Sequence, residues 1–207
     1  EVVERPPHLI KDLSENSLDA HASQIDIDVQ NGGRIVQVTD NGHGIFRDDF
    51  SLALGRHTTS KIRSVHDLWQ LGSYGFRGEA LSSIAAVSRL TLTSRREGDL
   101  TAYQMVSEFG SFSDLTAVGG TRGTSILIES LFENVPARLK FMKSEASELS
   151  QIKQTVKAMS LSHPEVQFRL KQGGRLLFFS AMTSSFLKKA QEVLEENDLF
   201  YTEGTDR

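Results

Sequence analysis

The segment Lys11-Asp12-Leu13-Ser14-Glu15-Asn16-Ser17-Leu18-Asp19-Ala20 is the most informative part of this 207-residue sequence. It predicts a helix that begins near Leu9, because two kinds of side chain recur at helical spacing. One face holds Leu9, Ile10, Leu13 and Ser17, and the other holds Asp12, Glu15, Asn16 and Asp19. Asp12 and Asn16 lie four residues apart and project from the same side. A carboxylate that could activate water therefore sits beside an amide oxygen that could ligate Mg²⁺, and a solvent-facing amphipathic helix is the plainer alternative.

A second segment, Asp40-Asn41-Gly42-His43-Gly44, follows two stretches with the pattern of paired strands. Residues 25–29 alternate like a half-buried strand, and a turn at residues 31–33 leads into a second strand over residues 34–39. Asp40 is thus predicted at a strand end, where its carboxylate could accept from an exocyclic amine such as adenine N6. Gly42 and Gly44 would let a flat base approach the backbone. The glycines disfavour a calcium loop, whereas a simple tight turn stays open.

A third, glycine-rich segment, Gly72-Ser73-Tyr74-Gly75-Phe76-Arg77-Gly78, leads into a helix predicted from about Glu79 to Val87. Free N–H groups at a helix start can bind an anion such as phosphate. The segment is neither a Walker A loop nor a GxGxxG fingerprint. Further on, Gly120-Thr121-Arg122-Gly123-Thr124 predicts a loop-to-strand turn where Thr124 could hydrogen-bond near a base. Each segment alone also fits an ordinary structural role; in this order the four indicate an ATP site without a lysine P-loop.

The sequence resembles the MutL family of DNA mismatch-repair ATPases, within the GHKL (Bergerat-fold) superfamily. The resemblance covers roughly residues 1–180. It rests on Glu1-Val2-Val3-Glu4-Arg5-Pro6, Glu15-Asn16-Ser17-Leu18-Asp19-Ala20, Arg56-His57-Thr58-Thr59-Ser60-Lys61, Gly75-Phe76-Arg77-Gly78-Glu79-Ala80-Leu81 and Pro136-Ala137-Arg138-Leu139-Lys140-Phe141. DNA gyrase, heat-shock chaperones and histidine kinases share the helix and the Asp-Gly turn, but not the last two of these signatures. The resemblance implies an α+β fold: a GHKL (Bergerat) two-layer α/β sandwich whose mixed, mostly antiparallel sheet carries helices on one face.

The resemblance also implies roles for individual residues. Asp12 would be the catalytic base, Asn16 the Mg²⁺ ligand and Asp40 the adenine reader, with Thr124 supporting the adenine end. The other nucleotide-binding positions that it implies are Ala20, Gly42 and Gly44, then Thr59, Ser60 and Lys61 in an ATP lid, and Gly75, Phe76, Arg77, Gly78, Glu79, Ala80 and Leu81 around the phosphates. The cofactors would be ATP and Mg²⁺.

Asp12 departs from the family, whose members usually have Glu four residues before the metal-binding Asn. Asp keeps the charge but loses one methylene of reach, and a misplacement of about 1 Å can cost ~100-fold in rate. Two functions therefore stay open: a slowly hydrolysing ATPase and a nucleotide-gated interaction module that hardly hydrolyses. A third, another GHKL enzyme such as a topoisomerase ATPase region, is disfavoured by the segment from Phe76 to Leu81.

The resemblance implies a molecular-matchmaker clamp of DNA mismatch repair that couples mismatch recognition to downstream excision. Its partners would be a MutS-type mismatch-recognition protein and DNA, the latter bound weakly and without sequence specificity. The full-length protein would dimerise when ATP binds. We would expect it in the cytoplasm or nucleoid of a bacterium, or in the nucleus of a eukaryote.

Composition limits the alternatives. The chain has 38% hydrophobic and 24% charged residues, as in an ordinary globular domain, and no apolar run of membrane-spanning length. A formal net charge of −4 argues against a uniformly basic nucleic-acid-binding surface. The absence of cysteine excludes disulfides, thiol catalysis and Cys-ligated zinc. We expect an ATPase domain over residues 1–182 that lacks its N-terminal arm, and the start of a truncated second domain or linker over residues 183–207.

The rest of the chain carries signals for further regular structure. We expect strands near residues 89–94, 102–107 and 124–129, and a hairpin formed by residues 166–170 and 176–180. Between them, Ser144 is a candidate N-cap for a helix that would end at His163-Pro164. These elements complete the predicted sheet and its helix layer.

Overall fold

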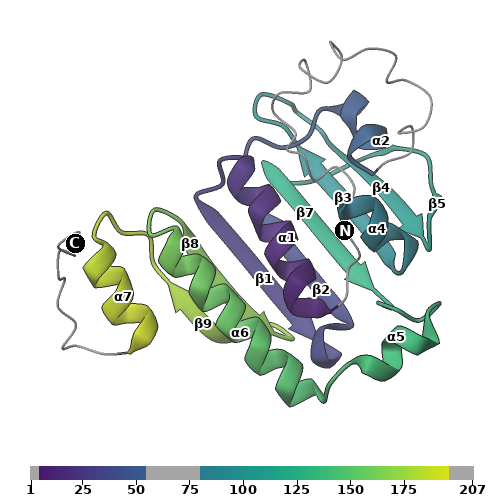
Figure 1. Ribbon diagram of the computed structural model, residues 1–207. Helices are drawn as coiled ribbons and strands as arrows, with labels where there is room; N and C mark the ends of the chain where they lie inside the picture. The colour runs from purple at the N-terminus through teal and green to yellow at the C-terminus, as the bar shows by residue number, and fades with distance from the viewer. Residues whose placement is uncertain (1–4, 55–79, 196–207) are drawn as a thin grey trace, which may run out of the picture.

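The sheet is mixed and mostly antiparallel, as the sequence predicts. In the computed structural model, which describes residues 5–54 and 80–195, the described residues form one nine-stranded sheet in the order β5-β4-β3-β7-β2-β1-β8-β9, with β6 paired to β4 (Figure 1). The strands are β1 (Gln24–Gln30), β2 (Ile35–Asp40), β3 (Arg89–Arg95), β4 (Ala102–Glu108), β5 (Ser111–Phe112), β6 (Thr116–Val118), β7 (Gly123–Glu129), β8 (Gln167–Gln172) and β9 (Arg175–Ser180). Only β1 and β8 pair in parallel within this sheet.

Helices form the second layer of the sandwich. The main ones are α1 (Pro6–Asp19), α4 (Ala80–Ala86), α6 (Glu145–Ser162) and α7 (Phe186–Leu194), with shorter elements at η1 (Asn31–Gly33), η2 (Arg47–Asp49), α2 (Phe50–Ala53) and α5 (Pro136–Phe141). In Figure 1, α1 and α6 lie side by side over one face of the sheet. The predicted α+β fold with helices on one face is therefore confirmed.

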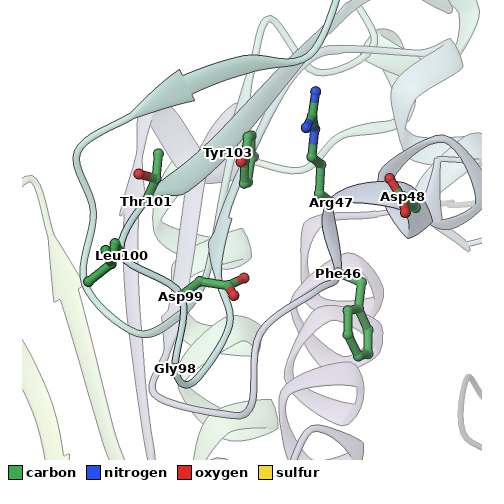
Figure 2. Close-up of a pocket in the computed structure, with 8 residues that line it drawn as sticks. All are labelled: Phe46, Arg47, Asp48, Gly98, Asp99, Leu100, Thr101 and Tyr103. Carbon is green, nitrogen blue, oxygen red and sulfur yellow. The ribbon is translucent and has the colours of Figure 1, made fainter.

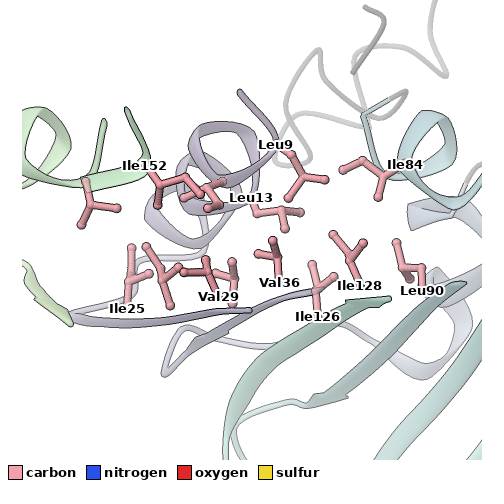
Figure 3. Packing of buried hydrophobic residues seen from close by; sticks show 14 of the residues in the cluster. Leu9, Leu13, Ile25, Val29, Val36, Ile84, Leu90, Ile126, Ile128 and Ile152 are labelled. Carbon is pink, nitrogen blue, oxygen red and sulfur yellow. The ribbon is translucent and has the colours of Figure 1, made fainter. Parts of the chain in front are cut away.

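The core lies between these two layers. Figure 3 shows Leu9 and Leu13 of α1 and Ile152 of α6 directed at apolar side chains of the central strands. Ile25, Ile27 and Val29 of β1 are buried, whereas their sequence neighbours are more exposed, as period-two alternation requires. The predicted buried face of α1 is also confirmed, because all four of its predicted residues are buried.

Local differences from the sequence-based expectations are small. The turn at residues 31–33 is a short 3₁₀ segment with Gly32 at φ 64°, and β2 begins and ends one residue later than predicted. The sequence patterns do not predict helix α5 or the two short strands β5 and β6. Ser144 caps α6 as predicted, because its side chain accepts a hydrogen bond from the Ser147 N–H. Among helices of the described ranges, none combines the length and hydrophobicity needed to cross a membrane.

Helix α7 packs on α6 and β9 at one end of the sheet. Its Lys189 is fully buried, and the ammonium group donates to the carbonyl oxygens of Val166 at 3.1 Å and Ala181 at 2.7 Å. Burial lowers the pKa of Lys189, and the nearby carboxylates of Glu192 and Glu165 partly offset this effect. The boundary expected between residues 182 and 183 stays a prediction.

Candidate functional site

The Asp40 carboxylate is the centre of the site. It lies at the end of β2 and is only 8% exposed. Its Oδ1 accepts hydrogen bonds from the backbone N–H groups of Gly42 at 2.8 Å and Thr124 at 3.2 Å. Its Oδ2 accepts from the Ser17 hydroxyl at 2.8 Å. Three elements, α1, β2 and β7, therefore meet on one side chain and fix its orientation.

Opposing effects set the charge of this carboxylate. Burial raises the pKa of Asp40 above its usual value, because a charge is costly away from water. The hydrogen bonds from Gly42, Ser17 and Thr124 and the nearby His43 pull the pKa back down. Each of these contacts favours the ionised form, which can only accept hydrogen bonds. The site is thus arranged to hold a buried hydrogen-bond acceptor.

Close backbone approaches around Asp40 explain the glycines. A Cβ at Gly42 would lie 2.7 Å from the Ala20 carbonyl oxygen and 3.0 Å from Asp40 Oδ1. The same Ala20 carbonyl accepts the His43 N–H at 2.9 Å, which joins the loop to the end of α1. Gly44, at φ +75°, leaves no room for a Cβ beside the Arg95 carbonyl. Thus Ala20 and Gly42 form a wall next to the carboxylate, where a larger side chain at position 42 would collide, and Gly44 fits the loop closely against Arg95.

Thr124 belongs to a small hydroxyl network at the start of β7. Its side chain is 8% exposed, and its Oγ1 lies 3.0 Å from the Ser94 Oγ of β3. Ser94 Oγ also contacts the Gly123 carbonyl oxygen at 3.0 Å and accepts from the Ile45 N–H at 2.9 Å. The network ties the loop after Gly44 to β3 and β7, so the predicted adenine end has a rigid support.

Asp12 and Asn16 occupy successive turns of α1, and both side chains are partly buried. Their neighbours Lys11 and Glu15 form a weak i,i+4 ion pair with an Nζ–Oε1 distance of 3.9 Å. Within residues 5–54 and 80–195, no group of three or more His, Asp or Glu side chains could hold a metal ion. An amide oxygen such as that of Asn16 is nevertheless a hard donor of the kind that Mg²⁺ takes together with phosphate oxygens.

The structure describes only part of the predicted phosphate side. Ala80 and Leu81 form the first turn of α4, where Ala80 is buried and Leu81 packs against the core. The predicted positions that lie outside the described residues are Thr59, Ser60 and Lys61 of the lid, and Gly75, Phe76, Arg77, Gly78 and Glu79 of the glycine-rich loop.

An open hollow of about 520 Å³ is lined in part by the residues that come just after Gly44 in the chain (Figure 2). It lies between η2 and the hairpin that joins β3 to β4. Its lining residues are Phe46, Arg47, Asp48, Gly98, Asp99, Leu100, Thr101 and Tyr103. The Arg96 guanidinium stacks 3.4 Å from the centre of the Phe46 ring, and Arg47 lies 5.3 Å from that of Tyr103. These stacked pairs shape the outer rim of the loop that follows Asp40.

The sequence does not identify Ser17 and Ser94 as site residues. Its pattern places Ser17 on the buried face of the helix, and a polar group on such a face needs a hydrogen-bond partner. This requirement could have marked Ser17 as a residue with a buried partner, although the sequence does not show which group accepts its hydrogen bond. Ser94 lies in a strand with no distinguishing pattern.

We expect Ser17→Ala to lower the free energy of unfolding by about 1–2 kcal/mol at neutral pH, because a buried carboxylate loses a donor. A hydroxyl has one proton, and the 2.8 Å contact to Asp40 is shorter than the 3.2 Å contact to the Leu13 carbonyl. Urea unfolding of the parent, Ser17→Ala, Asp40→Ala and the double variant measures the coupling between the two side chains, because alanine at either position removes the contact without replacing it. Strictly additive effects would show that the contact contributes nothing.

Comparisons with known proteins locate this arrangement in a family. The model described as "Histidine kinase-, DNA gyrase B-, and HSP90-like ATPase" matches residues 6–128, which include α1, the Asp40 loop and Thr124. Among solved structures, the Aquifex aeolicus MutL ATPase domain complexed with ADP is 30% identical with a TM-score of 0.77, and the match covers 94% of this chain and 70% of that one. The chain belongs to the MutL family of ATPases.

Curated relatives agree with this placement. The DNA mismatch repair protein MutL of Syntrophotalea carbinolica is 48% identical over 195 residues, which are 94% of this chain and 31% of that protein. The MutL protein of Neisseria meningitidis serogroup C is 49% identical over 179 residues, or 86% of this chain and 27% of that protein. The chain thus spans about three tenths of the length of these MutL proteins.

Proposed function

We propose that the chain is the ATP-binding and ATP-hydrolysing region of a MutL-type mismatch-repair protein. The observation that carries the proposal is the Asp40 carboxylate, which is buried and held by three donors beside the glycine wall. An ionised carboxylate accepts from the exocyclic amine of adenine and repels the carbonyl oxygen that guanine presents at the same position. The arrangement therefore favours ATP over GTP.

The other residues take roles around this contact. Thr124 supports the adenine end through its backbone bond to Asp40. Asn16 would ligate Mg²⁺, which when bound supplies positive charge beside the phosphates. Asp12, one turn earlier on α1, would orient and deprotonate the attacking water. The phosphates would bind backbone N–H groups of residues 77–81, and Thr59, Ser60 and Lys61 would form the lid of the site.

At the level of the whole protein, we propose a molecular matchmaker in DNA mismatch repair. Binding of ATP would drive dimerisation and signal from a MutS-type mismatch-recognition protein to downstream excision, with weak, non-specific contacts to DNA. Such a protein would act in the bacterial cytoplasm and nucleoid or in a eukaryotic nucleus. The identity to MutL proteins over most of this chain supports the role.

A nucleotide-gated module that hardly hydrolyses ATP is the second candidate. Asp12 is the observation that favours it, because this carboxylate ends one methylene short of the Glu usual in the family. The two candidates share nucleotide binding and differ in turnover.

Steady-state phosphate release by the full-length protein, with Mg²⁺ and ATP, decides between the two candidates. We expect slow turnover in the parent, roughly tenfold faster turnover in Asp12→Glu, and none measurable in Asp12→Asn, because only the first change restores reach. Glu15→Gln is the matched control, since Glu15 is the adjacent acidic residue on the same helix. Equal rates in the parent and Asp12→Asn, with ATP still bound, would favour the non-hydrolysing module.

A further inference from the structure

An ion pair at the start of α1 joins it to α6. Arg5 immediately precedes the helix, and its carbonyl oxygen accepts the N–H groups of His8 at 3.1 Å and Leu9 at 3.2 Å. The Arg5 Nη2 donates to Glu148 Oε1 at 2.8 Å. The Glu148 side chain is fully buried, and that of Arg5 is 24% exposed. The first turn of α1 is therefore attached to α6 by a charged contact that is largely shielded from water.

The pair is built into its surroundings on the Glu148 side. Glu148 Oε1 also accepts the Lys143 N–H at 2.9 Å, just before α6 begins. Among the described residues, Glu148 Oε2 and Arg5 Nε have no hydrogen-bond partner. The contact is thus a single charged hydrogen bond and not a two-bond fork.

The start of α1 depends on these tertiary contacts. The helix has no side-chain N-cap and no acidic residue in its first turn. Gly33 of η1 closes over the same turn, since a Cβ there would lie 2.5 Å from the Pro6 Cβ and 3.4 Å from the Ile152 Cδ1. Arg5 and Pro6 therefore sit in a socket formed by η1 and α6.

The other end of α1 is fixed separately. Ser17 donates to Asp40, and the Ala20 carbonyl accepts the His43 N–H. Asp12 lies between the two fixed ends, seven residues or about 10 Å along the helix from Arg5. Without the ion pair, only the packing of Leu9, Ile10 and Pro6 would hold the first end, so a shift there would displace Asp12 more than Ser17.

We propose that Arg5 and Glu148 are positioning residues for Asp12, which hold the N-terminal end of α1 while Ser17 and Asp40 hold its adenine end. The inference rests on the proposed function, because it assigns the consequence of misplacement to Asp12. An ion pair that only stabilised the fold would change turnover and ATP affinity together. Loss of the Arg5–Glu148 contact should lower turnover and leave adenine affinity unchanged.

The test compares the parent with the double variant Arg5→Met/Glu148→Met in the full-length protein. Replacing both partners avoids an unpaired buried charge, so the variant is expected to fold. We expect turnover to fall about tenfold or more, because small displacements of a catalytic group are costly. The dissociation constant for ATP should stay within about twofold, because the Ser17 and Asp40 contacts are intact. Arg5→Lys, which keeps one charged donor, should recover part of the turnover.

A second readout does not depend on activity. Without nucleotide, hydrogen exchange of the His8 and Leu9 amides should accelerate about tenfold in the double variant, because the turn that they close is released. The amides of Gly42 and Thr124, which bond to Asp40, should exchange as in the parent. Faster exchange confined to the start of α1, together with lost turnover, supports the proposal.

Three outcomes would overturn it. Unchanged turnover in the double variant would show that Asp12 is placed without the pair. Equal losses of turnover and ATP affinity, with faster exchange at Thr124, would indicate a general structural role. Equal turnover in the parent and Asp12→Asn would contradict the proposed hydrolytic role of Asp12 as well. The single Asp12 variant therefore tests the proposed function separately from the Arg5–Glu148 pair.

Discussion

Replacing Asp40 by asparagine is expected to raise the dissociation constant for ATP roughly 100-fold, which corresponds to the loss of a charged hydrogen bond. The variant should keep the fold. Its amide oxygen can still accept from the Gly42 and Thr124 N–H groups, and its NH₂ group can donate to the Ser17 hydroxyl oxygen. What changes is the group that faces the base, because an acceptor becomes a donor opposite the adenine amine.

Stability should respond in the opposite direction. Burial raises the pKa of Asp40 above 3.8, so the folded state holds this proton more tightly than the unfolded state. Between pH 3.8 and the raised pKa, the free energy of unfolding of the parent therefore falls as pH rises, and it is level above that window. Asp40→Asn does not show this fall in the free energy of unfolding, because asparagine does not ionise. Its stability relative to the parent should increase with pH across the window, whereas ATP binding by the parent should weaken as pH falls through the raised pKa.

Calorimetric titration with ATP, GTP and inorganic triphosphate measures the binding effect, and urea unfolding at several pH values measures stability. Asp114→Asn is the control, because Asp114 is exposed and lies in the loop before β6. Triphosphate should bind the parent and Asp40→Asn equally. An Asp40→Asn protein that bound ATP as tightly as the parent would show that the base lies elsewhere.

The second large effect is expected at Gly123, where alanine should lower the free energy of unfolding by about 4 kcal/mol. Gly123 has φ +106°, a conformation that side chains rarely adopt. An added Cβ would overlap the Asp40 carbonyl oxygen and lie 2.8 Å from the Asn41 Cα. All of these neighbours are backbone atoms, so relief would require β2 and β7 to separate at the Asp40 carboxylate.

Gly98→Ala separates the cost of the positive φ from the cost of the overlap with backbone atoms. Gly98 has φ +88°, and an added Cβ there would meet nothing within 4 Å. This control should cost only about 1–2 kcal/mol, from backbone strain alone. Urea unfolding of both variants gives the difference, and ATP binding of Gly123→Ala near 10 °C tests the accompanying damage to the site. Equal costs at the two glycines would mean that the close approach at Gly123 relaxes freely.

The regular elements are predictable because their patterns are local. The buried face of α1 follows from i, i+3, i+4 spacing, and β1 follows from the alternation of Ile25, Ile27 and Val29. The short strands β5 and β6 have only two and three residues, too few to show a period. Helix α5 begins at Pro136, a residue that marks a turn as readily as a first helical turn.

The site is predictable where one segment carries its own chemistry and not where distant segments meet. The sequence assigns Asp40, Gly42 and Thr124 to one site, and the structure brings them within hydrogen-bond distance. Ser17 reaches Asp40 across 23 residues, and Arg5 reaches Glu148 across 143. Such contacts depend on how the layers pack, which no short pattern encodes. The roles given to Asp12, Asn16 and the residues outside the described ranges stay predictions.

The parallel pairing of β1 with β8 has a consequence for synthesis on the ribosome. Strand β1 comes early in the chain, but its outer neighbour is complete only at residue 172. Until then the nascent sheet exposes the edge of β1, and until residue 162 α1 lacks its contact with α6. A chain that ended at residue 128, where the family match ends, would therefore present an open strand edge and bare apolar surface to chaperones and to other nascent chains. The hairpin of β8 and β9 is thus the last strand pair needed to close the site-bearing half, so this region completes its sheet only after residue 180 has been synthesised.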